Sequence, residues 1–418
     1  MKRKRCDIAI IGGGPAGVAA ATRAAQAGRS VVLVDAGANL GGQIWRGKEE
    51  VSQPAVARRW IAEFAESGAE CLTSARVFAT SGPRQFCIET PESVVTVDCD
   101  RLILATGARE LFLPFPNWTL AGVTGAGGLQ SLAKGGLDLK GARIVLAGSG
   151  PLLLAAADSF RKSGAHIAGV FEQASRGRVM RFGLGLIGHP RKAVQAAGMT
   201  ARLMGVRRHY SSWPLRVEGG DHIERVVMHT ARGDVSLACD YLACGFGLVA
   251  DIGVARHLGC EIVERRVWVD ERQQTSVADV FCAGEATGIG GVDKAVVEGC
   301  IAGLAAAGTE TLPAGLLRAR HHHQQFAIRL RAAFELRDEL RAMPSDETIV
   351  CRCEDVFWRE IRGHAGMRDA KLNSRCGMGP CQGKVCAPAL GFLCGWEEEG
   401  VREPFVPVRM SSMAELAE

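Results

Sequence analysis

A strand, a glycine-rich turn, a helix and a second strand follow one another in residues 7–35. Apolar residues lead into a turn at Gly12, and an alanine-rich stretch then leads to a second apolar run that ends at Asp35. This order is typical of a dinucleotide-binding α/β fold. Gly12 permits the tight turn, Gly14 lets the backbone approach a pyrophosphate, and Gly17 allows close packing of helix and strand. The free N–H groups of the helix start suit a phosphate, and Asp35 is placed to bond ribose hydroxyls.

Residues 143–172 repeat the same order with one departure. The repeat predicts two dinucleotide folds, the second inserted into the first. Leu153 stands where the third glycine is expected, and its side chain should push the helix away from the strand. Glu172 would suit the ribose of NAD, whereas Arg176 and Arg178 close behind it would suit a phosphate. Binding of NAD(P)H, binding of another nucleotide and a vestigial fold therefore all remain open for this copy.

Two later segments favour FAD over NAD at the first fold. Residues 100–108 and 279–293 each read as an apolar strand that runs into a glycine turn. They resemble the two later FAD motifs of the flavoprotein reductases that contain two dinucleotide domains. In that family an acid at the position of Glu285 bonds the ribityl chain of the flavin. Glu stands here where Asp is commoner, which lengthens the arm but keeps the acceptor.

Length and charge limit the kinds of protein that the chain could be. The 418 residues are enough for two or three domains. Charged residues make up 23% of the chain with a net charge of +5, and both signs are interspersed, so no nucleic-acid surface is expected. The apolar stretch behind the basic run Lys2–Arg5 is too short for a signal peptide, and the run Ile144–Ala157 is too short for a membrane helix. The sequence thus predicts a cytoplasmic protein without a transmembrane segment.

Six of the fifteen cysteines lie between Cys351 and Cys394. Four thiolates without histidine suit zinc or an iron–sulfur cluster, and the Cys-x-Cys spacing of Cys351 and Cys353 is tighter than the gaps usual in structural zinc sites. A [2Fe–2S] cluster is therefore favoured, with zinc as the alternative. Glycines 377, 379 and 383 would leave N–H groups free to approach cluster sulfides. The sequence after Cys386 resembles the start of the final helix in this kind of domain, which favours the ligand set Cys351, Cys353, Cys381 and Cys386 over one that includes Cys376.

Three further cysteines and a histidine tract are expected to have structural roles and no chemical function. The chain has no Cys-x-x-Cys, and Cys239 and Cys244 are expected to be core residues rather than a redox pair. Cys394 is expected to pack in the core. Consecutive helical side chains point about 100° apart, so His321, His322 and His323 should form a solvated helix face.

Four segments together resemble one family: Gly12–Gly17, residues 282–293, residues 351–356 and residues 376–383. They are similar to the alpha (A) subunits of bacterial opine oxidases and D-hydroxyproline dehydrogenases and to the B subunit of hydrogen cyanide synthase. The last segment resembles the [2Fe–2S] domain of the bacterioferritin-associated-ferredoxin type. The resemblance covers nearly the whole chain, and the cysteine segment is its most specific part.

The resemblance implies a fold, a division of labour and a set of cofactor contacts. It implies an α/β chain with two Rossmann-like domains of the flavoprotein disulfide-reductase type and a small helical [2Fe–2S] domain. A beta subunit with a D-amino-acid-oxidase-like flavin site would oxidise an amine or amino acid, this chain would relay the electrons, and a small ferredoxin-like gamma subunit often accompanies the pair. The acceptor could lie at the membrane, with the chain peripheral to it. The implied FAD contacts are Gly12, Gly14, Pro15, Ala16, Gly17, Asp35, Ala36, Gly42, Gln43, Val77, Ala105, Thr106, Gly107, Gly284, Glu285 and Val292.

The expected domains are an FAD domain in two parts, residues 1–117 and 251–311, and a degenerate NAD(P)-binding-like domain, residues 118–250. A helical linker (312–345), the [2Fe–2S] domain (346–400) and a tail (401–418) follow. No general base paired with an orienting acid is evident, so no catalytic residue is expected in this chain. Two alternatives remain: a self-contained NAD(P)H-dependent reductase, and a non-catalytic cluster protein whose flavin is structural.

Overall fold

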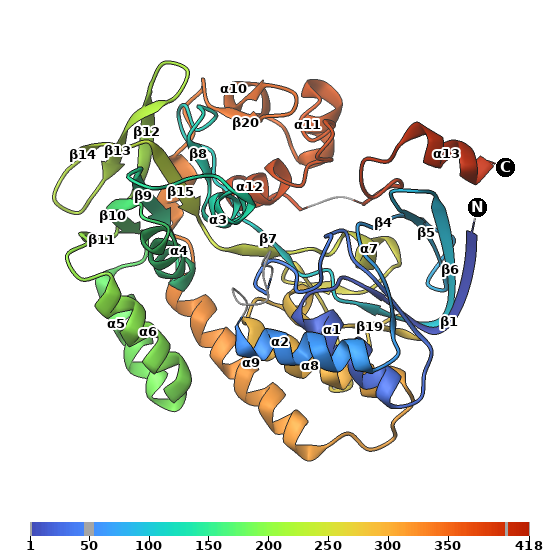
Figure 1. Cartoon of the computed structure of the whole chain (residues 1–418). Helices are drawn as coiled ribbons and strands as arrows, with labels where there is room; N and C mark the ends of the chain where they lie inside the picture. Colours follow the sequence, from blue (N-terminus) through green and yellow to red (C-terminus); the bar gives the residue numbers. More distant parts are fainter. Residues whose placement is uncertain (1, 46–53, 398–399, 418) are drawn as a thin grey trace. The chain divides into compact units, whose positions relative to one another are not determined.

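The computed structural model describes residues 2–45, 54–397 and 400–417, which form two compact units (Figure 1). Unit 1 comprises Met1–Arg109, Val249–Ile328 and Gly400–Glu418, and unit 2 comprises Glu110–Leu248 and Arg329–Glu399. The chain crosses between them through strands β7 (Ala108–Glu110) and β16 (Leu248–Ala250) and again within helix α9 (Ala314–Phe334). The second unit is therefore inserted into the first.

Unit 1 is built on one sheet with the strand order β3-β2-β1-β6-β5-β4, and β19 also pairs with β6. The neighbours β3, β2, β1 and β6 are parallel, whereas β4, β5 and β6 form an antiparallel ribbon. The basic run Lys2–Arg5 is part of β1, and its side chains pair with acids on neighbouring strands and loops. The strands are β1 (Lys2–Ile11), β2 (Val31–Val34), β3 (Glu70–Leu72), β4 (Arg76–Thr80), β5 (Gln85–Glu89), β6 (Val94–Leu104) and β19 (Val280–Cys282).

Helices and short elements complete unit 1. They are α1 (Pro15–Gln26), α2 (Ala55–Glu66), α7 (Gly253–His257), β17 (Ile262–Val263), β18 (Arg266–Val267), η3 (Gly284–Thr287), α8 (Val292–Ala306) and α13 (Met410–Ala417). The C-terminal segment packs on the antiparallel ribbon: Ser412 and Arg409 donate to the Glu89 carboxylate, and Val94 N–H donates to Glu415.

Two glycines of α8 bring its backbone against α1. A Cβ at Gly299 would lie 2.2 Å from the Ala16 carbonyl oxygen, and one at Gly303 would lie 2.3 Å from that of Ala20. No side chain fits at either position, so only glycine permits this helix crossing. The two FAD-like motifs, which precede α1 and α8, are therefore held next to each other.

Unit 2 contains a second parallel sheet with the order β11-β10-β9-β15-β8 and a separate antiparallel meander, β12-β13-β14. Helix α4 starts directly after β9, at the second glycine turn. The elements are β8 (Val123–Gly125), α3 (Ala126–Gly135), β9 (Arg143–Gly148), α4 (Pro151–Lys162), β10 (His166–Glu172), α5 (Arg176–Gly185), η2 (Leu186–Gly188), α6 (Pro190–Arg202), β11 (Arg208–Tyr210), β12 (Trp213–Gly219), β13 (Ile223–His229), β14 (Val235–Ala238) and β15 (Tyr241–Gly245).

The cysteine-rich region of unit 2 is small and has its own core, formed by Val350, Ile361, Leu390 and their neighbours. Its elements are η4 (Asp338–Ala342), β20 (Ile349–Cys351), β21 (Val356–Phe357), α10 (Trp358–Ile361), α11 (Met367–Ser374) and α12 (Cys386–Leu393). Among the described residues, no helix is long and apolar enough to span a membrane. The predicted pair of dinucleotide folds, with the second inserted into the first, is confirmed.

Candidate flavin site and cysteine site

The first glycine turn is closed so tightly that side chains are excluded. Gly12 has φ +110°, and a Cβ on it would lie 2.2 Å from the Ala105 carbonyl oxygen. A Cβ on Gly17 would lie 1.8 Å from the Gly12 carbonyl oxygen. The turn, the start of α1 and the end of β6 are thus in direct backbone contact, as the sequence predicts for Gly12 and Gly17.

The surroundings of this turn fit a dinucleotide. No side chain caps the start of α1, so the orphan N–H groups of its first turn are available to a phosphate. Among the residues that the structure describes, a Cβ on Gly14 would meet only the Gly42 Cα, at 3.9 Å, so one side of Gly14 is open to them. The Asp35 carboxylate accepts the N–H groups of Gly13 and Gly37, both at 2.6 Å, and each oxygen keeps a further lone pair for a hydroxyl.

A buried ion pair holds the third motif in place. The Lys294 ammonium donates to the Glu298 carboxylate at 2.7 Å, to the Gly284 carbonyl oxygen at 2.9 Å and to the Thr287 hydroxyl at 2.8 Å. Both side chains are almost fully buried, and Glu298 Oε1 has no hydrogen-bond partner among the described residues. The sequence motifs did not predict this pair. A Lys and a Glu four residues apart in a largely apolar helix were the available signal.

Glu285 lies on the turn that this ion pair holds. Its carboxylate accepts the N–H of Gly291 at 2.8 Å and that of Gly290 at 3.3 Å, and burial raises the pKa of Glu285. A Cβ on Gly284, which has φ +87°, would lie 2.8 Å from the Ala16 Cβ, so this turn contacts the first turn of α1. The predicted contact of Glu285 with a ribityl chain stays a prediction.

The other predicted contacts fall around these turns or in the sheet. Pro15 and Val292 are the first residues of α1 and α8. The Thr106 hydroxyl donates to the Asp251 carbonyl oxygen at 2.6 Å, and Val77 is a buried core residue of β4. Ala36, Gln43, Ala105 and Gly107 lie in the loops that follow β2 and β6, and Gly42 faces Gly14.

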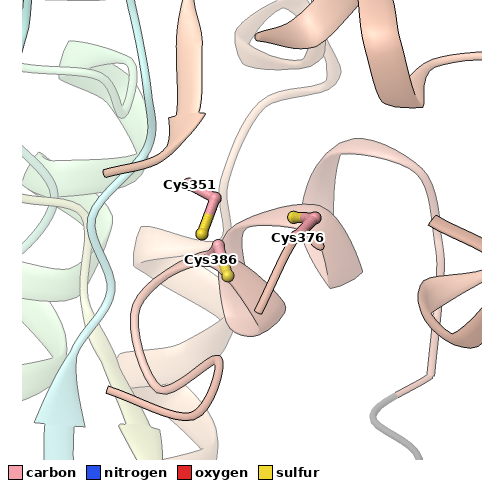
Figure 2. A group of neighbouring side chains, drawn as sticks. All are labelled: Cys351, Cys376 and Cys386. Carbon is pink, nitrogen blue, oxygen red and sulfur yellow. The ribbon is translucent and has the colours of Figure 1, made fainter. Parts of the chain in front are cut away.

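Three of the cysteines in the C-terminal region form a buried group, shown in Figure 2. Cys351 ends β20, Cys376 follows α11, and Cys386 begins α12. Their three sulfur atoms lie within 4.8 Å of one another. In Figure 2 the sulfur atoms of Cys351 and Cys376 point toward Cys386.

The electrostatics of this group favour a bound cation. The thiols of Cys376 and Cys386, followed by the N–H groups of Gly377 and Glu354, stabilise the Cys351 thiolate and lower its pKa. The contact with Cys351, together with burial, raises the pKa of Cys376 to about 12, and the contacts with Cys351 and Cys376 raise that of Cys386. Three adjacent sulfurs can all become thiolates only when a positive ion compensates their charge.

The two remaining cysteines of the motif form a separate pair. Cys353 is exposed and Cys381 half-buried, and their thiols are hydrogen-bonded, with burial and this contact raising the pKa of Cys353. A Cβ on Gly379 would lie 2.3 Å from the Cys353 Cβ. The absence of a side chain at Gly379 therefore lets its loop lie against the loop that holds Cys353. Of the four predicted ligands, Cys351 and Cys386 thus lie in one group with Cys376, whereas Cys353 contacts Cys381.

Cys376 is the cysteine of this motif that the predicted ligand set omits. The structure places its sulfur beside those of Cys351 and Cys386. Left-handed backbone at Arg375 (φ +64°), Gly377 (φ +80°) and Gln382 (φ +54°) turns this loop inward. The choice of four ligands among five cysteines stays a prediction.

The remaining candidate residues behave as expected. Cys239 and Cys244 are buried, and burial raises the pKa of Cys239 to about 12. Cys394 packs against the core of the cysteine-rich region. Among the described residues, the cysteine group above is the one cluster of three or more side chains that could hold a metal ion, and His321 and His322 are exposed on α9.

Comparison with known proteins agrees with this geometry. The model of the family described as pyridine nucleotide-disulphide oxidoreductase matches residues 6–299, which include both glycine turns. The chain belongs to this family. The A subunit of opine oxidase from Agrobacterium tumefaciens (strain Ach5) is 30% identical over 98% of this chain and 92% of that relative. The HcnB subunit of hydrogen cyanide synthase from Pseudomonas protegens is 29% identical over 90% of this chain and 89% of its own length.

The solved structures support the fold. L-proline dehydrogenase from P. horikoshii superposes with a TM-score of 0.69 over 99% of this chain and 80% of that chain, at 19% identity. The relatives therefore match the family that the sequence motifs resemble, and the chain is an oxidoreductase of the flavoprotein type.

Proposed function

We propose that this chain is the electron-transfer flavoprotein subunit of a multi-subunit dehydrogenase that acts on amines or amino acids of the opine, D-hydroxyproline or glycine type. In this proposal a partner beta subunit with a D-amino-acid-oxidase-like flavin site oxidises the CH–NH bond of the substrate. A small [2Fe–2S] gamma subunit joins the complex, which lies in the cytoplasm or at the membrane surface through its acceptor.

The observation that carries the proposal is the presence of two different redox-cofactor sites in one chain. The uncapped start of α1, the open side of Gly14 and the fixed Asp35 carboxylate fit FAD. Cys351, Cys376 and Cys386 form one group of thiols and Cys353 contacts Cys381, so this region offers the four thiolates that a [2Fe–2S] cluster takes. FAD supplies two-electron chemistry that can also proceed in single steps, and such a cluster carries one electron.

The protein's own groups would bind and tune these cofactors. The N–H groups at the start of α1 bind phosphate oxygens, and Asp35 accepts ribose hydroxyls. The Lys294–Glu298 pair holds the Gly284 turn against α1, which fixes the backbone there before the cofactor binds. The Gly377 N–H already donates to Cys351 Sγ at 3.4 Å, and such hydrogen bonds raise the reduction potential of a cluster.

The names of the relatives support the proposal that this chain works with a partner subunit. The opine oxidase and hydrogen cyanide synthase relatives are each named as one subunit of a larger enzyme. The sequence provides no pairing of general base and orienting acid for amine oxidation. We therefore assign the chemical step to the partner and the electron relay to this chain.

The test compares the chain purified alone with the chain purified together with a co-expressed beta subunit. Both preparations are mixed anaerobically with D-hydroxyproline, octopine, nopaline or glycine while flavin and cluster absorbance are followed. Reduction only in the complex is expected. Turnover of any of these amines by the lone chain, at a rate close to that of the complex, would place the chemistry in this chain and refute the proposal.

A further inference from the structure

The second glycine turn is covered by a segment of the chain itself. The segment Phe334–Arg337 joins the end of α9 to the cysteine-rich region, and all its contacts described below lie within unit 2. In dinucleotide folds the pyrophosphate lies on the glycine turn and the helix start, and the ribose lies by the acid that ends the next strand. In unit 2 these places are Ser149–Gly150 and Glu172.

The ring of Phe334 lies over the glycine that a pyrophosphate would approach. A Cβ on Gly150 would lie 3.7 Å from Phe334 Cγ, which is ordinary van der Waals contact. The ring also packs edge-on against Phe182 of α5, with ring centroids 5.2 Å apart. Gly150, whose φ is +94°, is thus covered by an aromatic side chain instead of being open like Gly14.

Backbone atoms of the segment complete the hydrogen bonds of the turn. The Ser149 hydroxyl donates to the Phe334 carbonyl oxygen at 2.9 Å. The fully buried Gln173 side chain donates to Ser149 Oγ at 2.8 Å and to the Glu335 carbonyl oxygen at 3.3 Å, and its own oxygen accepts the Arg337 N–H at 3.2 Å. Gln173 therefore binds the segment on both sides, as a residue built into a receptor site does.

The charges that would suit a nucleotide are also engaged. Glu172 is buried and its carboxylate accepts the N–H groups of Gly150 at 2.7 Å and Ala174 at 2.8 Å. Arg178, which could have bound a phosphate, contacts Glu335 through both the carbonyl oxygen at 3.4 Å and the carboxylate at 3.8 Å. A nucleotide would have to displace the segment to reach Gly150 or Arg178.

The segment also anchors the cysteine-rich region to the second fold. Arg337 donates to Ser211 Oγ at 3.1 Å and its guanidinium lies 5.5 Å from the centre of the Trp213 ring. A second anchor lies closer to the cysteines, where Trp118 Nε1 donates to the Ile349 carbonyl oxygen at 2.6 Å. Both anchors join the same fold to the chain that leads into Cys351.

We infer that the second dinucleotide fold is a binding site for the chain's own segment Phe334–Arg337, which replaces a nicotinamide nucleotide and keeps NADH and NADPH out. The fold thus carries the cysteine-rich region in place of a coenzyme. This inference stands on contacts inside unit 2 and does not depend on the identity of the amine or of the partner.

The test measures NADH and NADPH binding to the FAD-loaded full-length chain by calorimetry. Two variants open the site independently: Phe334→Ala removes the ring from Gly150, and Gln173→Ala removes the side chain that binds the segment on both sides. Arg331→Ala, at an exposed position of α9, is the matched control. The wild type and the control should show no saturable binding up to about 1 mM, and each opening variant should bind at least about tenfold more tightly.

Two results would overturn the inference. One is wild-type binding of either nucleotide with a Kd below about 0.1 mM. The other is unchanged, weak binding in both opening variants although they retain FAD and their far-UV spectrum. Should the variants lose their fold, hydrogen exchange of the wild type decides: protection of the Arg337 amide should not change with NADH, and faster exchange would show that the nucleotide displaces the segment.

Discussion

The two glycine turns of this chain use the same backbone frame for different purposes. A Cβ on Gly12 would collide with the Ala105 carbonyl oxygen at 2.2 Å, and one on Gly148 would collide with that of Gly245 at 2.1 Å. In both turns an acid at the end of the next strand accepts a glycine N–H. Asp35 reaches Gly13, whereas the longer side chain of Glu172 reaches Gly150. A closely packed glycine turn and an acid that accepts a glycine N–H are therefore compatible with a nucleotide site but do not guarantee one.

The turns differ at the start of the helix and in what covers it. Gly17 brings α1 onto its turn, whereas Leu153 is a buried core residue whose side chain would touch a Cβ on Gly245 at 3.6 Å. Because Leu153 has a real Cβ, α4 cannot approach its turn as closely as α1 does. The first turn is left uncapped, and the second is covered by Phe334. A nucleotide site thus requires an uncovered turn as well as its glycines.

The largest effect is expected at the closest contact of the first turn. Gly17→Ala places a Cβ 1.8 Å from the Gly12 carbonyl oxygen, so α1 must move and FAD binding should be lost. The measurement is the ratio of bound FAD to protein after purification. Gly183→Ala in α5 is the control, because a Cβ there meets nothing within 4 Å and should stabilise the helix by up to about 1 kcal/mol. Full FAD content in Gly17→Ala would show that the turn tolerates displacement.

The next effect concerns the cysteine-rich region. Anaerobically purified protein should contain two irons and two labile sulfides per FAD, as a [2Fe–2S] cluster requires. Ser replacement of Cys351, Cys353, Cys381 or Cys386 should each remove the iron, whereas Cys376→Ser should retain it. Iron and sulfide analysis with the visible spectrum provides the measurement. Loss of iron in Cys376→Ser together with its retention in Cys386→Ser would show that Cys376, and not Cys386, is a ligand.

The rate of flavin reduction by NADH and NADPH distinguishes an electron-relay subunit from a self-contained reductase. Because Leu153 replaces the glycine that permits close helix packing and Phe334 covers Gly150, NADH and NADPH should reduce the bound FAD slowly or not at all. Anaerobic stopped-flow absorbance measures the rate, with dithionite as the control for reducible flavin. Rapid stoichiometric bleaching by either nucleotide would favour the reductase.

The smallest effect is the pH dependence that Glu172 gives to the stability of the fold. Burial raises the pKa of Glu172 to about 7, above its value in the unfolded chain. The folded state therefore holds a proton that the unfolded state releases, and the stability this provides is present below about pH 4.5 and lost as the pH rises through about 7. Wild type should lose about 1–3 kcal/mol of stability between pH 5 and pH 8 relative to Glu172→Gln. Thermal unfolding of both proteins across this range tests it, and parallel curves would contradict it.

The sequence predicted those features that depend on neighbouring residues. Gly12, Gly17 and Asp35 lie within one local motif, and their spacing alone fixes strand, turn and helix. The core position of Cys239 and Cys244 followed equally well from the apolar strand around them. These predictions needed no knowledge of distant parts of the chain.

The features that the sequence did not predict depend on distant or irregular contacts. Phe334 covers Gly150 although the two are far apart in the chain, and no periodic pattern reports such a contact. The grouping of Cys376 with Cys351 depends on left-handed backbone at Arg375 and Gln382, residues that rarely adopt it. The spacing of the cysteines was enough to identify the site. Which cysteines lie next to one another depends on the loop conformation, which the spacing does not determine.

The placement of the C-terminal segment has a consequence for synthesis on the ribosome. Arg409 and Glu415 bind the ribbon formed by β4, β5 and β6, so unit 1 contains both early and late parts of the chain. Synthesis proceeds at about 5–20 residues per second, and roughly 300 residues separate the ribbon from this segment, which takes about 15–60 s. The second glycine turn and its sheet emerge well before the first fold receives its last partners. The fold that begins first is therefore completed last, and a chain released early would expose the ribbon that the C-terminal segment covers.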